Sequence, residues 1–227
     1  MKSAVTRPQT ATAPTRSLHR IAVVSETFAP ESNGVAHTLD HLSRELRERG
    51  VEVDLVAPRH PARSEVREPF SHTVIGVPLP GYTTVRCGLV RPRTLETLWH
   101  IRPPDAVYVA TEGPLGWAAV TAARRLGVAV VSGFHTRFDA YCQHYGGARL
   151  SAAVHGYLRW FHNRTDLTLA PTAALKQRLE QTGYRSVEVL RRGVDTERFH
   201  PEHFCSSLRA SWKASATRAA RPRAGGP

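Results

Sequence analysis

The stretch RIAVVSETFAPESNGVAHTLDHLSRELRERGVEVDLVAP, residues 20–58, holds one complete structural unit. Its first six residues are a short apolar run rich in β-branched side chains, which is typical of a strand buried on both faces. Leu39, Leu42 and Leu46 follow at spacings of three and four, and this spacing predicts one apolar face of a helix that ends at Gly50. A second apolar run, VEVDLVAP, closes the stretch. The predicted order is therefore strand, helix, strand.

The same alternation continues through most of the chain. Further strands are expected at residues 72–78, 106–110, 128–134, 167–171 and 186–193, and further helices at residues 91–105, 113–127, 148–164 and 172–183. Helices of this length between strands make βαβ units, in which the strands run parallel. We therefore predict an α/β fold with a single Rossmann-like, doubly wound parallel sheet over residues 20–200. Ligands of such sheets bind outside the carboxyl ends of the strands.

Composition narrows the class of protein. With 227 residues and 41% hydrophobic content, the chain can bury the core of one domain. It has no apolar run of the roughly 18 residues that a membrane-spanning helix needs. Cys87, Cys142 and Cys205 match neither a disulfide framework nor the paired spacing of a zinc site. We therefore expect a cytoplasmic protein without a metal.

The net charge of +12 lies mostly at the two ends of the chain. Residues 1–19 contribute +3 and residues 201–227 contribute +4, which leaves +5 for residues 20–200. The ends are rich in Ala, Thr, Pro and Arg, so we expect a disordered leader at residues 1–19 and a linker with a disordered basic tail at residues 201–227. The remaining surplus suits anionic small molecules or an anionic membrane surface. Because no nucleic-acid-binding motif is present, nucleic acid is not an expected partner.

The loop after the first strand places Asn33 and Gly34 directly before the expected helix. A helix N-terminus attracts phosphate through its N–H groups and partial positive charge, and glycine lets the backbone approach an anion closely. The fingerprint G-x-G-x-x-G and the Walker A pattern are both absent from the sequence, which argues against a dinucleotide cofactor or a P-loop. A turn with glycine at a positive φ is the alternative interpretation of Asn33–Gly34.

Three further stretches follow expected strands at the same edge. SGFHTRFDAY places His135 just past a strand end, where its imidazole can hydrogen-bond to a ligand in the crevice. The other histidines are interpreted as packed or surface residues. LRRGVDTERFHP places Arg191 and Arg192 after the last strand, where they either grip a diphosphate or are surface charge. TEGPLG is a second glycine-bearing turn between a strand and a helix.

In this order and spacing, four stretches resemble glycosyltransferase family 4, the retaining enzymes of the GT-B fold. They are ETFAPESNGVAHTLDHLSRELRERGVEVDLVAP, ATEGPLGWAAVTAARRLGVAVVSGFHTRF, YLRWFHNRTDLTLAPT and LRRGVDTERFHP. The resemblance covers residues 20–201 and is greatest to bacterial mannosyltransferases that glycosylate lipids. In that family two Rossmann-like domains face each other, the N-terminal one holding the acceptor and the C-terminal one the nucleotide sugar. Only the N-terminal half is similar here.

The resemblance implies transfer of a hexose, mannose or glucose, with retention. The donor is a nucleotide sugar such as GDP-mannose or a UDP-sugar, and the acceptor is a lipid or another hydroxyl compound. Contact with the transferred sugar at the reaction centre is implied for His135, donor diphosphate binding for Asn33, Gly34, Val35 and Arg192, and acceptor binding for Glu112, Thr136, Arg137, Tyr141 and Tyr145. The family implies a same-face mechanism without a protein nucleophile or cofactor. Stabilising the leaving diphosphate is then the main catalytic contribution.

The sequence departs from the family pattern after Pro201. A second Rossmann-like domain of roughly 150–200 residues is expected there, but the chain ends in a segment rich in Ala, Arg, Pro and Gly. We therefore expect a truncated or frameshifted chain that is inactive alone, with a free-standing domain as the alternative. The alternative function is a non-catalytic module that binds a sugar or lipid-phosphate headgroup, or docks to a partner. A third alternative is a sugar epimerase of the GT-B fold, which would also need the second Rossmann-like domain.

Residues 86–102 are a candidate for contact with a membrane surface. They predict a basic face beside an apolar face, as in helices that lie on an anionic membrane, and the contributing residues are Arg86, Arg91, Arg93 and Arg102 with Leu89, Leu95, Leu98 and Trp99. Peripheral contact with the inner face of the cell membrane is therefore expected. A surface helix packed on the sheet is the alternative.

Overall fold

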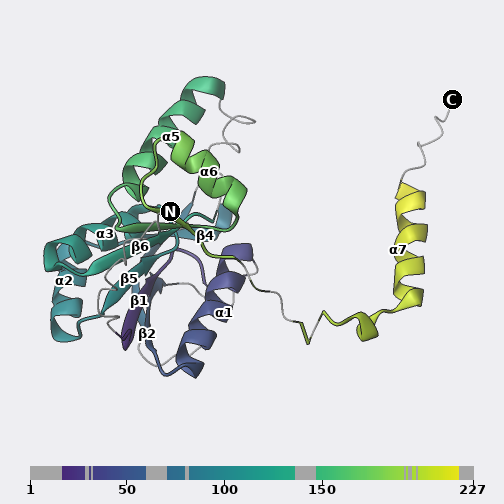
Figure 1. Cartoon of the computed structure of the whole chain (residues 1–227), viewed down its shortest axis with the longest axis horizontal. Coiled ribbons are helices and arrows are strands. Elements are labelled where there is room, and N and C mark those ends of the chain that lie inside the picture. Colours follow the sequence, from purple (N-terminus) through teal and green to yellow (C-terminus); the bar gives the residue numbers. More distant parts are fainter. Residues whose placement is uncertain are drawn as a thin grey trace, which may run out of the picture. The chain divides into compact units, whose positions relative to one another are not determined.

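The computed structural model describes residues 17–28, 31, 33–59, 71–79, 82–135, 147–191, 193, 196–197 and 199–219. The chain forms two compact units, Met1–Arg191 and Arg192–Pro227, and the first contains the whole sheet (Figure 1). In the second unit, the 3-10 turn Pro201–His203 precedes α7, Ser206–Ala219. Within α7, Leu208 and Trp212 lie one turn apart and are both exposed.

The described residues form one eight-stranded sheet in the order β4-β3-β2-β1-β5-β6-β7-β8. The strands are β1 Arg20–Val24, β2 Glu52–Pro58, β3 Ser71–Leu79, β4 Tyr82–Leu89, β5 Ala106–Val109, β6 Ala129–Gly133, β7 Leu167–Ala170 and β8 Val187–Val189. Neighbouring strands pair parallel, except that β3 and β4 are antiparallel. The strand order reverses between β1 and β5, which is the switch point where doubly wound sheets bind ligands.

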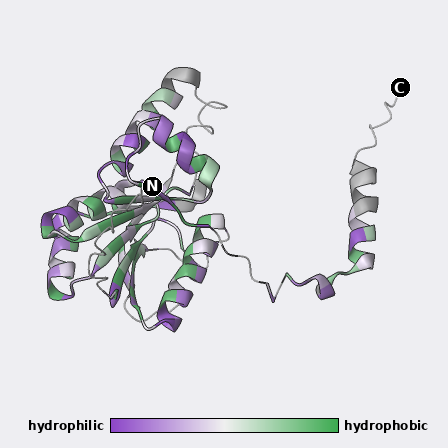
Figure 2. Cartoon of the chain, in the orientation of Figure 1, coloured by the Kyte–Doolittle hydropathy of each residue, from purple (hydrophilic) through white to green (hydrophobic). Residues whose placement is uncertain are grey.

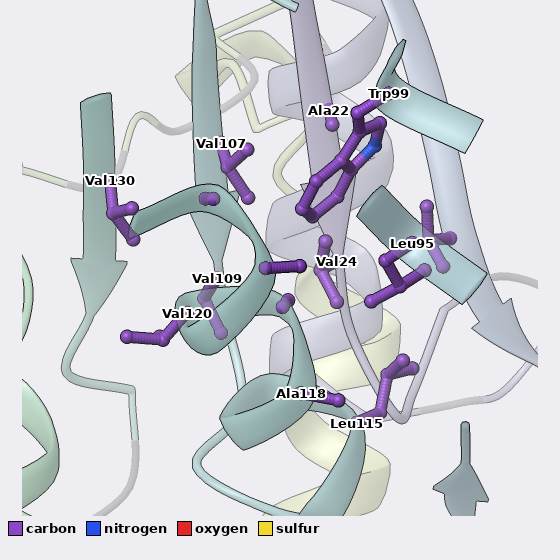
Figure 3. Packing of buried hydrophobic residues seen from close by; sticks show 14 of the residues in the cluster. Ala22, Val24, Leu95, Trp99, Val107, Val109, Leu115, Ala118, Val120 and Val130 are labelled. Atoms are coloured by element: carbon purple, nitrogen blue, oxygen red, sulfur yellow. The ribbon is translucent and has the colours of Figure 1, made fainter. Parts of the chain in front are cut away.

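Helices cover both faces of this sheet. Among its described residues, the first unit has the helices α1 Gly34–Glu48, α2 Pro92–Ile101, α3 Pro114–Leu126, α5 Gly147–His162 and α6 Ala173–Gln181. On one face Leu39 of α1 packs in a cluster with Val23 of β1, and on the other face Trp99 of α2 and Leu115 of α3 pack in a cluster with Val24 (Figure 3). Both faces of β1 are therefore buried, as its continuous apolar sequence predicts. Figure 2 shows hydrophobic residues along the central strands and both kinds of residue along α1.

Strand β4 was not expected from the sequence, and the sheet is therefore not purely parallel. The sequence pattern predicts no strand at residues 82–89, but they pair with β3 through Ile75↔Leu89 and Val77↔Cys87. An edge strand needs only one buried face, so its apolar content is low and its signal in the sequence is small. Gly88 lies where a Cβ would be 2.9 Å from the Leu115 side chain, so this edge packs closely on α3.

The basic and apolar residues of segment 86–102 do not all lie on one helix. Arg86 and Leu89 belong to β4, and α2 begins only at Pro92. Leu95 and Trp99 are each 2% exposed because they pack into the core. The apolar face of α2 is thus covered by the protein itself, as the alternative interpretation held. Among the described residues, no helix combines the length and apolar character needed to cross a membrane.

Candidate functional site

The carboxyl ends of the three central strands bring together most of the described candidate residues. Glu26 follows β1, Glu112 follows β5 and His135 follows β6. Asn33 is the N-cap of α1, and Gly34 is its first residue. Thr136, Arg137, Tyr141, Tyr145 and Arg192, which were expected to contact acceptor or diphosphate, lie outside the described residues.

The N-terminus of α1 is capped by the side chain of Asn33. Its Oδ1 accepts hydrogen bonds from the backbone N–H groups of Val35 (3.1 Å) and Ala36 (2.9 Å). Its amide Nδ2 donates to the Thr27 hydroxyl, which ties the cap to the loop after β1. Two of the first-turn amides are therefore occupied by the protein's own cap. An anion at this terminus could therefore interact with the helix dipole and with the backbone amide of Gly34, which is an exposed residue.

The N-terminus of α3 is filled by a buried carboxylate. The Leu115 N–H donates to Oε1 of Glu26 at 3.1 Å, and Glu26 is 6% exposed. A Cβ on Gly113 would lie 2.1 Å from the same oxygen, so only glycine leaves room for this contact. Burial raises the pKa of Glu26, while hydrogen bonds from Thr111, Leu115 and Gly113 oppose the rise.

The carboxylate of Glu26 makes the two central helix termini unlike each other. A phosphate at the start of α3 would meet a carboxyl group, whereas the start of α1 is headed by a neutral amide cap and Gly34. Sequence reasoning missed Glu26, although an acid directly after the first strand was a visible signal. A carboxyl group at the start of α3 thus disfavours an anion at that helix terminus.

Glu112 belongs to a buried polar chain that reaches α5. Its Oε1 lies 3.2 Å from Nε2 of His162, and Nδ1 of His162 lies 2.8 Å from the Ser132 hydroxyl. Ser132 in turn contacts the Thr165 hydroxyl at 2.9 Å. Ser132 and His162 are 0% exposed, so this serine, histidine and glutamate cannot meet a substrate as a hydrolytic triad. Glu112 is 8% exposed and turns its Oε1 toward His162, so the expected acceptor contact of its side chain stays a prediction.

His135 is held by a tyrosine on the neighbouring strand. The hydroxyl of Tyr108, on β5, lies 2.8 Å from Nε2 of His135, and the two rings meet edge to face. His135 is half-buried, and Tyr108 is 3% exposed. The structure thus places the imidazole at the carboxyl end of β6, where the sequence predicted it, with a partner that the sequence did not reveal.

An apolar groove adjoins the loop after β5. It is lined by Glu112, Gly113, Pro114, Trp117, Tyr157 and Trp160. The Tyr157 hydroxyl donates to the backbone carbonyl of Glu112 at 2.5 Å, and this bond fixes α5 to the loop. Trp117, Tyr157 and Trp160 are each 40–45% exposed. The groove therefore offers an aromatic surface beside the strand ends.

The sequence of the chain is similar to a family of known proteins. The model of Glycosyltransferase Family 4 matches residues 32–198. A GDP-mannose-dependent alpha-mannosyltransferase of Mycobacterium tuberculosis is 33% identical over 198 residues, which are 85% of this chain and 52% of the relative. One of Corynebacterium glutamicum is 29% identical over 200 residues, covering 86% and 48%. The chain spans about half the length of the curated mannosyltransferases that it matches.

Solved structures show the same fold. Sucrose-phosphate synthase from Thermosynechococcus elongatus superposes with a TM-score of 0.61 at 12% identity, covering 86% of this chain and 52% of that chain. S. aureus MnaA with UDP gives a TM-score of 0.50 at 17% identity, covering 86% and 50%. These likenesses confirm the Rossmann-like α/β fold that the sequence predicted. Since the family model covers most of the chain, the chain belongs to glycosyltransferase family 4.

Proposed function

We propose that this chain is the acceptor-side half of a retaining mannosyltransferase that takes its sugar from GDP-mannose. The proposal is supported by the similarity to GDP-mannose-dependent alpha-mannosyltransferases of Mycobacterium tuberculosis and Corynebacterium glutamicum. The acceptor hydroxyl belongs to a lipid or glycan. Because the chain spans about half of those relatives, the donor and the acceptor are both part of the proposal.

The observation that carries the proposal is the difference between the two central helix termini. Glu26 fills the start of α3, and Gly34 heads α1 with its Cβ-free backbone exposed. A donor diphosphate that faces this edge is therefore directed to Gly34 rather than to Gly113. Asn33 and Val35 act there by building the cap, and Arg192 supplies a guanidinium to the same diphosphate.

The chemistry needs no protein nucleophile in this proposal. The acceptor oxygen forms its bond to the anomeric carbon on the face from which the bond to the diphosphate breaks. The acceptor proton passes to the leaving phosphate oxygen. His135 contacts the transferred sugar, and the α1 dipole with Arg192 stabilises the developing charge on the diphosphate.

A lipid acceptor would require the enzyme to work at a membrane surface. We propose that the enzyme works in the cytoplasm at the inner face of the membrane when its acceptor is a lipid. Leu95 and Trp99 are buried, so contact with anionic headgroups has to rest on exposed basic side chains such as Arg91 and Arg93.

The test is transfer by a fused enzyme, in which residues 1–198 are joined to the carboxyl-terminal half of the Mycobacterium tuberculosis relative. Radiolabelled GDP-mannose is supplied with lipid and oligosaccharide acceptors, and UDP-glucose serves as the competing donor. We expect mannose transfer by the fused enzyme and no turnover by residues 1–227 alone. Transfer by residues 1–227 alone would contradict the assignment to one half of the site. A folded fusion that binds sugar or headgroup without transfer would favour the non-catalytic binding module.

A further inference from the structure

Tyr108 and His135 come from neighbouring strands and meet at the edge where the proposed transfer takes place. Tyr108 is the third residue of β5, and His135 follows β6 by two residues. The 2.8 Å contact joins the Tyr108 hydroxyl to Nε2 of His135. The ring planes are at 90° with centroids 6.3 Å apart. The tyrosine thus reaches the imidazole nitrogen with its hydroxyl rather than stacking on the ring.

Gly133 makes room for this pair. A Cβ at Gly133 would lie 2.3 Å from the Tyr108 hydroxyl oxygen and 2.5 Å from Nε2 of His135. Any other residue at this position would therefore push the two groups apart. Because Tyr108 is 3% exposed and packs with Val23 and Leu39 of the core, its ring cannot swing away to accommodate a methyl group. The Tyr108 hydroxyl thus contacts Nε2 of His135, and the missing side chain at Gly133 leaves the space for that contact.

We propose that Tyr108 is a positioning residue for His135. The hydrogen bond fixes the plane of the imidazole at the carboxyl end of β6. The hydroxyl also favours one neutral tautomer, because a phenol donates a hydrogen bond more readily than it accepts one, and a donating Tyr108 leaves the His135 proton on Nδ1. The role of His135 toward the sugar rests on the proposed function, but the geometry of the pair does not. Tyr108 acts through His135 and has no contact with the reacting atoms in this proposal.

The test uses the full chain and a spectroscopic signal of the imidazole. In ¹⁵N-labelled protein at neutral pH, two-bond ¹H–¹⁵N correlation spectra report the shifts of the two ring nitrogens of His135, assigned by their loss in His135→Gln. We expect widely separated shifts in the wild-type chain, as a single neutral tautomer gives. Tyr108→Phe removes only the hydroxyl, and we expect the two shifts to move toward each other as the tautomers mix.

A matched control separates this effect from a general loss of structure. Tyr157→Phe removes another partly buried hydroxyl, the one that donates to Glu112, and leaves the His135 signals in place. Unchanged His135 shifts in a folded Tyr108→Phe variant would overturn the proposal. Averaged tautomers in the wild-type chain would overturn it as well, even if the variant does not fold. Failure of the fused enzyme to transfer mannose refutes the proposed function and leaves these signals unaffected.

Discussion

Glu26 is a buried acid whose ionisation changes the stability of the fold. Burial raises its pKa, so between the unfolded and folded pKa values the folded chain keeps a proton that the unfolded chain has released. Stability is therefore lost as the pH rises through the folded pKa of Glu26. Hydrogen bonds from the Leu115 and Gly113 amides offset part of the cost of burying the Glu26 carboxyl group at the start of α3.

Replacing Glu26 by glutamine removes this titration while keeping the shape of the side chain. Relative to Glu26→Gln, the wild-type chain is expected to lose free energy of unfolding as the pH rises from the ordinary glutamate pKa of about 4.3 through the raised folded pKa of Glu26, by on the order of 1 kcal/mol per pH unit between the two pKa values. Urea denaturation at a series of pH values measures the difference. Glu48→Gln, at an exposed position, controls for the loss of one negative charge. A wild-type minus Gln difference that is constant with pH would contradict the burial argument.

At the scale of elements, the start of α3 depends on the absence of a side chain at Gly113. In Gly113→Ala the new methyl group would meet the Glu26 carboxyl group at 2.1 Å, and we expect a loss of about 1–3 kcal/mol in the free energy of unfolding. The Glu26→Ala and Gly113→Ala losses are expected to be less than additive, because removing the carboxyl group frees the space. Denaturation of the two single variants and the double variant measures this coupling.

Gly156 provides the matched control for that experiment. It lies in the middle of α5, and a Cβ there would meet nothing within 4 Å. Gly156→Ala is therefore expected to leave stability unchanged or raise it by up to about 1 kcal/mol through helix propensity. Full stability of Gly113→Ala, or strict additivity with Glu26→Ala, would show that the contact between Gly113 and Glu26 does not matter.

The elements themselves follow closely from local sequence patterns. The predicted leucine periodicity of α1 is confirmed, and Gly50, with a φ of +80°, lies just past the Arg49 C-cap of this helix. Thr172 caps α6 through the Leu175 N–H, a local contact of the same kind. Contacts between Glu26 and α3, between Glu112 and His162, and between Tyr108 and His135 could not be predicted. Each joins residues 27 to 89 positions apart, and each depends on how elements distant in the sequence pack together, which no local pattern encodes.

At the scale of the whole molecule, the doubly wound sheet brings distant residues to one edge. The reversal of strand order at β1 and β5 places the start of α1, the loop after β5 and His135 around the same switch point. Buried networks behind this edge, from Glu26 to α3 and from Glu112 to α5, hold its loops in place. Gly34 is then the proposed point of approach for a donor diphosphate.

The decisive measurement is the rate of mannose transfer by the fused enzyme carrying Gly34→Val. The valine side chain would stand at the exposed start of α1, where the diphosphate has to approach. We expect transfer to fall by at least about 100-fold, the size of effect seen when one anion-stabilising donor is lost. Circular dichroism should show an unchanged fold, and Gly156→Val should keep the parent rate. An unchanged rate in Gly34→Val would contradict the assignment of the diphosphate to the N-terminus of α1.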